Sequence, residues 1–437
     1  MRIGKARLLR RTTVAMAAAL LLAGCGGQPA AHVQHRPSPT PTPDPARVVT
    51  QQADQFMQLF EHGDYEEQWS DLSDAARAEW PSETARTAML TAKFQGMQAT
   101  YSLGTPVGGA AWASGEDLDS VSGLWRVPVT VSLQGGAPQV ADTGSAYQNL
   151  DLYLTPPTGT GADEVFPQVV GEGPASLDAP VLAVSGTPRT VQVPILMYHD
   201  VNTYPNRAAF PSEYAYQLQY GLTCGIQEFQ QQMGWLHSNG FHAISLVRLA
   251  DAIDYGLPLP DKPLIITFDD GYYGPYVNAT PVLRQDRFAA TFFLPSGYVN
   301  WINATQHYMS WPELQQLEQQ GFWVEDHTRN HVAVFGLGAK QLRTQIVDSK
   351  EQIESRLDTP VQFFAYPGGW PFPSANEAGP QEQAVFSVLH GAGYQFAVTD
   401  QSDPSDAQSG GRPYQLPRIR VAANESIQEY ASSLSAA

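Results

Sequence analysis

Residues 263–271, "PLIITFDDG", set two aspartates side by side at the end of an apolar run and follow them with a glycine. Successive side chains of a strand point to opposite faces, so Asp269 and Asp270 cannot both face one site within a regular strand. The pair is therefore expected just beyond the strand, where Gly271 permits a sharp turn. In parallel α/β folds this end of the strands lines the ligand site. The alternative for these three residues is a plain polar turn.

The surrounding sequence repeats the same order of strand and helix. Apolar strands are predicted within 193–201, 263–271, 290–299, 361–369 and 394–400, and helices are predicted within 226–241, 310–322 and 339–357. Strands that alternate with helices and are apolar throughout are typical of a parallel sheet covered by helices on its faces. The fold class predicted for this half of the chain is α/β, with an open sheet or a closed barrel.

A second polar stretch, "DHTRNH" at 326–331, follows the apolar residues "GFWV" by two positions. It places His327 and His331 four residues apart, on one face if the stretch is helical. Two imidazoles and one carboxylate form a three-ligand zinc site with an open position for water. One aspartate of the pair at 269–270 can then bind the metal while the other acts as a base on that water. Chance spacing among ten histidines is the alternative.

The combination of "TFDDG" and "HTRNH" resembles the first two motifs of the polysaccharide deacetylases, the NodB-homology or carbohydrate esterase family 4 proteins, across residues 193–425. The resemblance implies that Asp269 is the base and that Asp270, His327 and His331 bind a divalent metal. Zn²⁺ is the expected ion, with Co²⁺ or Ni²⁺ as alternatives. The implied fold is a distorted, incomplete (β/α) barrel. The implied reaction is hydrolysis of N-acetyl groups on a GlcNAc-containing polysaccharide.

The sequence departs from the family pattern in two places. The third motif lacks its arginine before Pro367, and the late histidine that usually acts as the acid is missing. The stretches "PILMYHDV" and "LPRIRV" are similar to the branch that deacetylates poly-N-acetylglucosamine. This implies that His199 donates a proton to the leaving amine and that Arg418 orients Asp269. The alternatives are a histidine that merely ends a strand and an arginine in a surface salt bridge.

Several further residues near strand ends are candidates for contact with substrate. Tyr366, Pro367 and Gly368 are expected to shape one wall, and Tyr272 is expected to contact a sugar. Aromatic residues after strand ends, which sugar rings could stack on, are Tyr272, Tyr273, Tyr276, Tyr298, Trp301, Trp311 and Trp370. Packing in the core or at the rim is the default for each of them. Asp200 and Asp400 are interpreted as solvated turn residues.

The N-terminus, "MRIGKARLLRRTTVAMAAALLLAGC", combines basic residues with a short apolar stretch, as export signals do. The end, "LLAGC", resembles the lipobox of bacterial lipoproteins, which implies cleavage after residue 24 and lipidation of Cys25. Residues 25–46 are rich in proline and too polar to fold, so they are predicted to form a tether. The expected location is outside the cytoplasm, anchored to the bacterial cell membrane. A plain secretory signal is the alternative.

Between the tether and the barrel, the pattern predicts a small α+β domain. Helical periodicity from Val48 onward is followed by the alternating stretches "LWRVPVTVSL" and "YQNLDLYL". This arrangement resembles NTF2-like domains. The predicted boundaries are a signal peptide at 1–24, the lipidated tether at 25–46, an NTF2-like domain at 47–170, a linker at 171–190 and the deacetylase domain at 191–437.

The composition sets limits on partners. The 437 residues carry a formal net charge of −18, which argues against nucleic acid and anionic lipid surfaces. Membrane contact is therefore expected only through the lipid, and Cys224 is expected to be a buried free thiol. The leading hypothesis is a metal-dependent carbohydrate deacetylase acting on an N-acetylated polysaccharide. A catalytically weak glycan-binding or scaffold lipoprotein, or an O-acetyl esterase using the same metal site, remains open, as does the oligomeric state.

Overall fold

The structure is a computed structural model that describes residues 44–78, 80, 82–113, 120–135, 146–156, 169–173, 189–368, 379–400 and 408–435. The predicted signal peptide, the lipidation at Cys25, the tether up to residue 43 and Trp370 lie outside these residues. We call the described residues from 44 to 173 the N-terminal region and those from 189 to 435 the barrel region. No helix in the described part of the chain is both long enough and apolar enough to cross a membrane.

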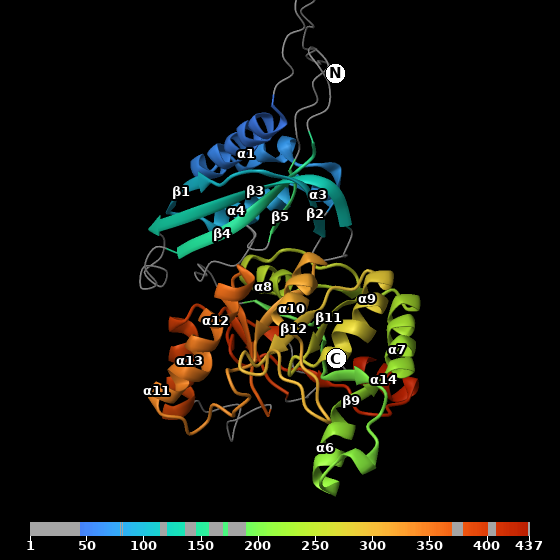
Figure 1. The fold of residues 1–437 in the computed structure, drawn as a ribbon. Coiled ribbons are helices and arrows are strands. Elements are labelled where there is room, and N and C mark those ends of the chain that lie inside the picture. The colour runs from blue at the N-terminus through green and yellow to red at the C-terminus, as the bar shows by residue number, and fades with distance from the viewer. Residues whose placement is uncertain are drawn as a thin grey trace, which may run out of the picture. The chain divides into compact units, whose positions relative to one another are not determined.

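The N-terminal region contains helices followed by an antiparallel sheet (Figure 1). The helices are α1 (Pro45–His62), α2 (Tyr65–Gln68), α3 (Asp74–Ala78) and α4 (Glu83–Lys93). The strands are β1 (Met97–Leu103), β2 (Val107–Ala113), β3 (Ser120–Gly135), β4 (Ala146–Leu154) and β5 (Val169–Gly173). They pair in the order β1-β3-β4-β5, and β2 also pairs with β3.

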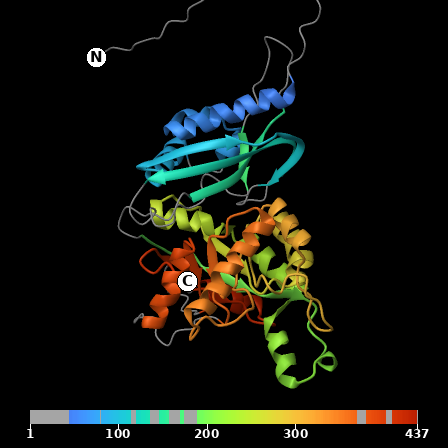
Figure 2. The ribbon, with the colours of Figure 1, turned by 60° about the vertical axis from the view of Figure 1, so that its left-hand side comes forward.

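Helix α1 is built as its sequence predicts. The Asp44 side chain accepts a hydrogen bond from the backbone N–H of Ala46 at 3.1 Å, and Gly63 ends the helix in the left-handed conformation. Its apolar face, including Phe56 and Phe60, is buried in the core of this region. Figure 2 shows α1 lying across one face of the sheet. The helices and strands predicted here are confirmed, and β5 continues the sheet to Gly173, past the boundary expected at residue 170.

The barrel region is organised around a parallel sheet. Its strands are β7 (Ile195–Tyr198), β11 (Pro263–Phe268), β12 (Thr291–Leu294), β13 (Trp323–Asp326), β14 (Phe363–Ala365), β15 (Phe396–Val398) and β17 (Ile419–Arg420), in the order β15-β14-β13-β12-β11-β7-β17. A short strand, β10 (His242–Ala243), pairs with the start of β11. These residues confirm the predicted α/β class.

The two ends of this sheet meet across one short segment. The backbone N–H of Leu416 donates to Ala397 O at 3.0 Å, and Thr399 N–H donates to Leu416 O at 2.9 Å. Three residues later, Ile419 pairs with Leu196 of β7. Residues 416–419 thus border β15 at Leu416 and β7 at Ile419. Among the described residues the path around the ring has seven strands, with β10 paired beside it, whereas a complete barrel has eight; this confirms the predicted incomplete (β/α) barrel.

Most helices of the barrel region surround the ring, and α6 (Glu213–Leu222) projects away from it (Figure 1). The helices are α6, α7 (Ile226–Ser238), α8 (Leu246–Tyr255), α9 (Thr280–Asp286), α10 (Trp311–Gln319), α11 (Ala339–Leu342), α12 (Asp348–Leu357), α13 (Pro380–Gly391) and α14 (Ile427–Ser435). Alternate strand residues face different cores: Ile265 packs with the α8 residue Leu249, whereas Ile266 packs with the helix residues Phe229 and Leu314. Cys224 is a buried free thiol, as expected.

Candidate metal-centred active site

The two aspartates lie where the sequence predicts, at the carboxyl end of β11. The strand ends at Phe268, and the chain turns at once because Asp270 and Gly271 both adopt a φ of 72°. This left-handed conformation is costly for a residue with a side chain, and it rotates the Asp270 carboxylate away from the path of the strand. The turn therefore lets two adjacent carboxylates reach the same site. Asp269 is 2% exposed and Asp270 is 5% exposed.

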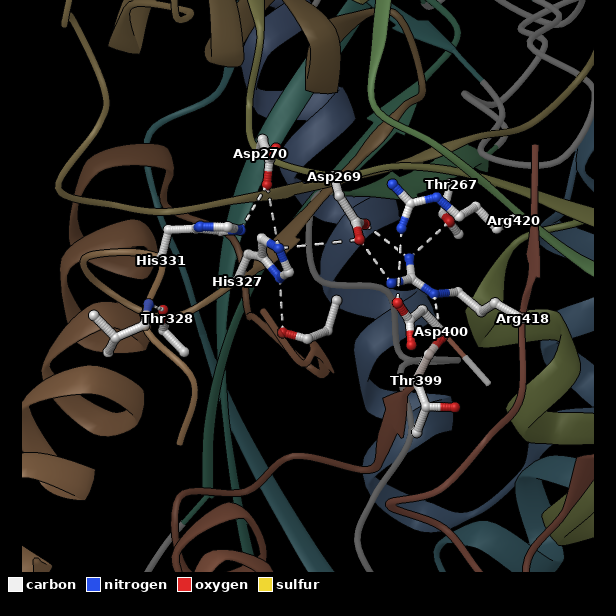
Figure 3. A network of polar contacts seen from close by, with 12 residues as sticks. Thr267, Asp269, Asp270, His327, Thr328, His331, Thr399, Asp400, Arg418 and Arg420 are labelled. Atoms are coloured by element: carbon white, nitrogen blue, oxygen red, sulfur yellow. Dashed lines mark hydrogen bonds and ion pairs between the residues drawn. The ribbon is translucent and has the colours of Figure 1, made fainter. Parts of the chain in front are cut away.

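Asp270, His327 and His331 converge on one point (Figure 3). The Nε2 atom of His331 lies 2.9 Å from Oδ1 of Asp270, and Nε2 of His327 lies 3.4 Å from the same oxygen. One ligand atom from each residue lies within 4.8 Å of the other two. The Asp270 Oδ1 is buried and accepts no well-aligned hydrogen bond in the described structure. Two nitrogens and an orphaned carboxylate oxygen are the donor set of a divalent cation, so these residues fit a zinc-type ion.

A backbone carbonyl fixes the orientation of His327. Its Nδ1 lies 2.8 Å from the carbonyl oxygen of Ala365 in β14. A carbonyl can only accept, so Nδ1 must carry the proton of this bond, and in the neutral ring Nε2 then has a lone pair. That lone pair is on the side of the ring that faces the aspartates. Such a second hydrogen bond is the usual way in which proteins hold a metal-binding imidazole.

The stretch between His327 and His331 is not helical. The two side chains therefore do not share one face of a helix, as they would if the stretch were helical. Thr328 and His331 have φ angles of 63° and 51°, so the chain folds through a turn. Gln345 anchors this turn, because its carbonyl accepts from Arg329 N–H at 2.9 Å and its side chain accepts from Asn330 N–H at 3.0 Å. The turn, rather than helical periodicity, brings His331 to Asp270. Half of the expectation is therefore confirmed: the imidazoles converge, by a different backbone route.

Arg418 binds Asp269 with both of its terminal nitrogens. Nη1 donates to Oδ1 at 2.7 Å and Nη2 donates to Oδ2 at 2.6 Å, while Nη1 also reaches the Thr267 hydroxyl at 3.1 Å (Figure 3). Burial raises the pKa of Asp269, but the charge and hydrogen bonds of Arg418 outweigh burial and hold that pKa below its usual value. Arg418 is buried, so the surface salt bridge is ruled out. Asp269 is thus an ionised carboxylate whose Oδ2 lies 4.0 Å from Nε2 of His327.

His199 follows β7 directly and is half-buried beside the two aspartates. Burial lowers its pKa, and the nearby Asp270 and Asp269 charges oppose that effect only in part. The positive charges of Arg420 and Arg418 lower the pKa further. The predicted proton donor therefore lies within the electrostatic reach of the predicted base.

The predicted substrate contacts are mostly covered. Tyr272 is buried, and its ring stacks on Tyr308 with ring centroids 5.0 Å apart. Tyr366 is buried and donates its hydroxyl proton to the Tyr414 carbonyl at 3.1 Å. Pro367 is buried as well, whereas Gly368 is exposed. These positions favour supporting roles for both tyrosines, and their contact with substrate stays a prediction.

Asp200 is buried, so its interpretation as a solvated turn residue is wrong. It starts β8 (Asp200–Asn202), which pairs with β9 (Thr223–Gly225), and it is 8% exposed. Gly274 packs directly on it, since a Cβ at that position would lie 2.0 Å from Asp200 Oδ1. Burial, with a smaller contribution from the Asp270 charge, raises the pKa of Asp200 to about 7. The other such residue, Asp400, is half-buried, and its Oδ2 lies 3.8 Å from Nη1 of Arg420.

Sequence reasoning also missed Asp326, the residue before His327. One of its oxygens accepts from the Ser349 hydroxyl and the other from the Tyr394 hydroxyl, both at 2.6 Å. These bonds fix the end of β13 from which His327 departs. The available signal was a pair of acidic residues, Glu325 and Asp326, inside an otherwise apolar strand. Their partners are distant in sequence, so the pattern could not name them.

Known proteins are similar to this chain in sequence. Residues 256–379 match the family described as polysaccharide deacetylase. A putative polysaccharide deacetylase of Bacillus subtilis, YxkH, is 26% identical over 235 residues, which cover 54% of this chain and 73% of that protein. The poly-beta-1,6-N-acetyl-D-glucosamine N-deacetylase of Escherichia coli K12 is 21% identical over 249 residues, which cover 47% of this chain and 34% of that protein. This chain thus spans about a third of the length of the E. coli relative.

Among solved structures, the Streptococcus pyogenes deacetylase PplD in complex with acetate is similar to this chain with a TM-score of 0.47 and 22% sequence identity. That similarity covers 57% of this chain and 99% of the other. The family match includes both aspartates and both histidines of the site. The chain therefore contains a polysaccharide deacetylase domain, and the curated relatives that it matches are named as deacetylases.

Proposed function

We propose that this protein is a metal-dependent N-deacetylase that hydrolyses N-acetyl groups on a GlcNAc-containing polysaccharide. The observation that carries this proposal is the division of labour between the two neighbouring aspartates. Asp270 shares one point with His327 and His331, while Asp269 is held apart from that point by Arg418. The curated relatives support the substrate class, because one is named for poly-beta-1,6-N-acetyl-D-glucosamine and another for peptidoglycan N-acetylglucosamine.

Asp270, His327 and His331 would hold the metal, which we propose to be Zn²⁺. When bound, such an ion lowers the pKa of water and polarises a carbonyl oxygen. Asp269 takes the proton from the attacking water, and Arg418 keeps this carboxylate ionised and pointed at the site. His199, on the neighbouring strand, gives a proton to the amine that leaves as the C–N bond breaks. Each proton thus has a named residue that accepts or supplies it.

The experiment that tests this function is acetate release from GlcNAc oligomers by the purified protein. We expect release that a chelator removes and that added Zn²⁺ restores. Asp358→Asn serves as a control, because Asp358 is another aspartate with a positive φ but is exposed beyond the end of α12. Acetate release that continues undiminished after chelation would contradict the proposed metal chemistry. Faster release from an O-acetylated glycan than from GlcNAc oligomers would shift the assignment to an esterase.

We further propose that the protein works outside the cytoplasm as a lipoprotein anchored through Cys25. The basic and apolar leader that ends in "LLAGC" supports this proposal. Mass spectrometry of the protein from a bacterial membrane fraction should find residues 1–24 removed and a diacylglycerol group on Cys25. Replacement Cys25→Ala should release the protein from that fraction. An intact N-terminus at Met1 would contradict this proposal.

A further inference from the structure

We propose that Trp301 is a stacking platform for a sugar ring of the polysaccharide, next to the ring that carries the acetyl group. This inference rests on the proposed function and extends its site from one sugar to an oligomer. Trp301 is 44% exposed, so part of its apolar ring surface reaches solvent. Exposed apolar surface beside a site often marks a region that binds a ligand.

Three aromatic rings form a stack beneath that surface. Tyr272 and Tyr308 stack with centroids 5.0 Å apart and planes inclined by 20°. Tyr308 and Trp301 stack with centroids 5.5 Å apart and planes inclined by 1°. Tyr272 and Tyr308 are both 4% exposed, so the stack rises from the core to the surface. Tyr308 covers one face of the Trp301 indole, and we infer that the exposed part of Trp301 includes the opposite face.

Backbone hydrogen bonds hold Trp301 in place. Residues 300–309 form a hairpin in which Tyr308 N–H donates to Trp301 O at 3.0 Å and Asn300 N–H donates to Met309 O at 3.0 Å. Ile302 pairs with His307 in an antiparallel bridge nearer the tip. The His307 ring also stacks on Tyr273 at 4.0 Å. A platform fixed in this way loses little side-chain freedom when a ligand binds, which favours affinity.

The platform is continuous with the metal ligands. The Tyr298 ring lies 5.3 Å from the Trp301 ring and 6.2 Å from the His331 ring, as measured between centroids. Asp270, Tyr298 and Tyr308 line one narrow recess. A chain of contacts therefore runs from the metal ligand His331 through Tyr298 to Trp301. A polymer whose acetyl group reaches Asp269 has its neighbouring sugars at this surface.

The chemistry of the free indole face suits a pyranose ring. The ring of a β-linked GlcNAc residue presents a flat face of C–H groups, and an aromatic face carries partial negative charge that attracts such hydrogens. An amino sugar that has already lost its acetyl group carries a positive charge, which the same face also attracts. The expected ligand is therefore an oligomer, with an advantage for two or more linked sugars over a single GlcNAc.

Binding measurements on the full chain test this inference directly. With Zn²⁺ present and Asp269→Asn to stop turnover, calorimetry would measure binding of the β-1,4 and β-1,6 GlcNAc pentamers and of the GlcNAc monomer. We expect Trp301→Ala to weaken binding of one or both pentamers about tenfold and to leave the monomer unchanged. Trp301→Phe keeps a ring and should weaken it less than about threefold. Trp301→Leu keeps apolar packing on Tyr308 without a ring and should behave like Trp301→Ala.

Ile302→Ala is the matched control, because it removes exposed apolar surface from the same hairpin without touching the stack. With Asp269 restored, Trp301→Leu should raise KM for the pentamer about tenfold with kcat nearly unchanged, whereas a purely structural role would lower kcat as well. Three results would overturn the platform: neither pentamer binds, Trp301→Leu binds both pentamers as tightly as its parent, or Ile302→Ala loses as much affinity. Pentamer binding that depends on Trp301 without any acetate release would refute the deacetylase activity and keep the platform.

Discussion

The N-terminal region and the barrel region differ in which residues adopt a backbone conformation with a positive φ. Among the described residues of the N-terminal region, a positive φ occurs only at glycines, as at Gly63 and Gly96, where it costs little. The barrel region has eight non-glycine residues with a positive φ, and they are Lys262, Asp270, Arg287, Asn300, Thr328, His331, Asp358 and Asn424. Three of these, Asp270, Thr328 and His331, belong to the turns that carry the candidate metal ligands. A strained backbone at these three residues supports a functional role for the candidate site.

The two regions also treat a buried arginine differently. In the N-terminal region, Arg86 is 2% exposed and donates hydrogen bonds to neutral groups, the Gln68 side chain and the Tyr65 carbonyl. In the barrel, Arg418 is equally buried but meets a carboxylate, Asp269, through two short bonds. The first arrangement satisfies donors within a core. The second arrangement keeps the Asp269 carboxylate ionised at the candidate active site, where a shifted pKa can serve catalysis.

The largest expected effect is the removal of a metal ligand. Asp270→Ala takes away the oxygen on which both imidazoles converge, so bound Zn²⁺ and acetate release should both fall, the latter about 10³-fold or more. Metal analysis and an acetate assay measure the two losses. Asp358→Ala makes the same change at another aspartate with a positive φ and should leave both unchanged. Equal losses in the two variants would mean that backbone strain, and not metal binding, explains the result.

Removal of the base should separate catalysis from metal binding. Asp269→Asn keeps the shape of the side chain but cannot accept the proton from water, so acetate release should fall about 10²-fold to 10⁴-fold. The Zn²⁺ content should stay near that of the unmodified protein, because Asp269 lies outside the set of converging ligand atoms. A variant that loses its metal together with its activity would show that Asp269 is itself a ligand.

The sequence predicted the α/β class and the place of the aspartates because both follow from local rules, whereas the incomplete barrel came from the resemblance to a family. An apolar run that ends in "DDG" leaves no regular strand position for two inward carboxylates, and the structure ends β11 at Phe268. The role of Arg418 was accessible only through resemblance to a family. Its partner lies 149 residues away in the chain, and no periodicity connects the two.

The features that the sequence pattern did not reveal have a common physical origin in tertiary contacts. His327 and His331 were expected to share a face if helical, but the carbonyl of Gln345 captures the backbone between them and produces a turn. Asp200 has the composition of a solvated turn, yet Gly274 allows the chain to pack directly on its carboxylate. Tyr272 follows a strand end as a sugar-binding residue would, but Tyr308 covers it. In each case a residue distant in sequence determines the environment.

The contrast between the two arginines predicts unequal losses of stability. Arg418→Met strands the buried Asp269 carboxylate and should lower the free energy of unfolding by about 3–5 kcal/mol. Arg86→Met leaves only neutral oxygens without a donor and should cost about 1–3 kcal/mol. Denaturant unfolding of the metal-free protein, followed separately for each region, measures both values. Equal losses would remove the distinction that we draw between the two regions.

The same substitution should change the pH dependence of catalysis. Arg418 lowers the pKa of Asp269, so the base stays ionised, and active, in mildly acidic solution. Without Arg418 that pKa rises, and the acidic limb of kcat/KM should move to higher pH. Arg418→Lys keeps the positive charge and should move the limb less than Arg418→Met does. An acidic limb that stays in place in Arg418→Met would show that another group controls it.

The smallest expected effect concerns Asp200, a buried carboxyl at the edge of the site. Its pKa is about 7 in the folded protein and about 3.9 when unfolded, so the folded state binds its proton more tightly. The stability that this proton contributes is complete below about pH 4 and is lost as the pH rises to about 7. Three pKa units correspond to at most about 4 kcal/mol, and relaxation around the charge should reduce this to about 1–2 kcal/mol.

Asp200→Asn cannot ionise and should therefore stabilise the chelated protein at pH 8 relative to wild type, with little difference at pH 4. Thermal unfolding at both pH values measures this, and Asp358→Asn should show no such dependence because Asp358 is exposed. A difference between Asp200→Asn and wild type that is the same at both pH values would mean that Asp200 is already ionised in its buried position, and that the site tolerates a third negative charge beside Asp269 and Asp270.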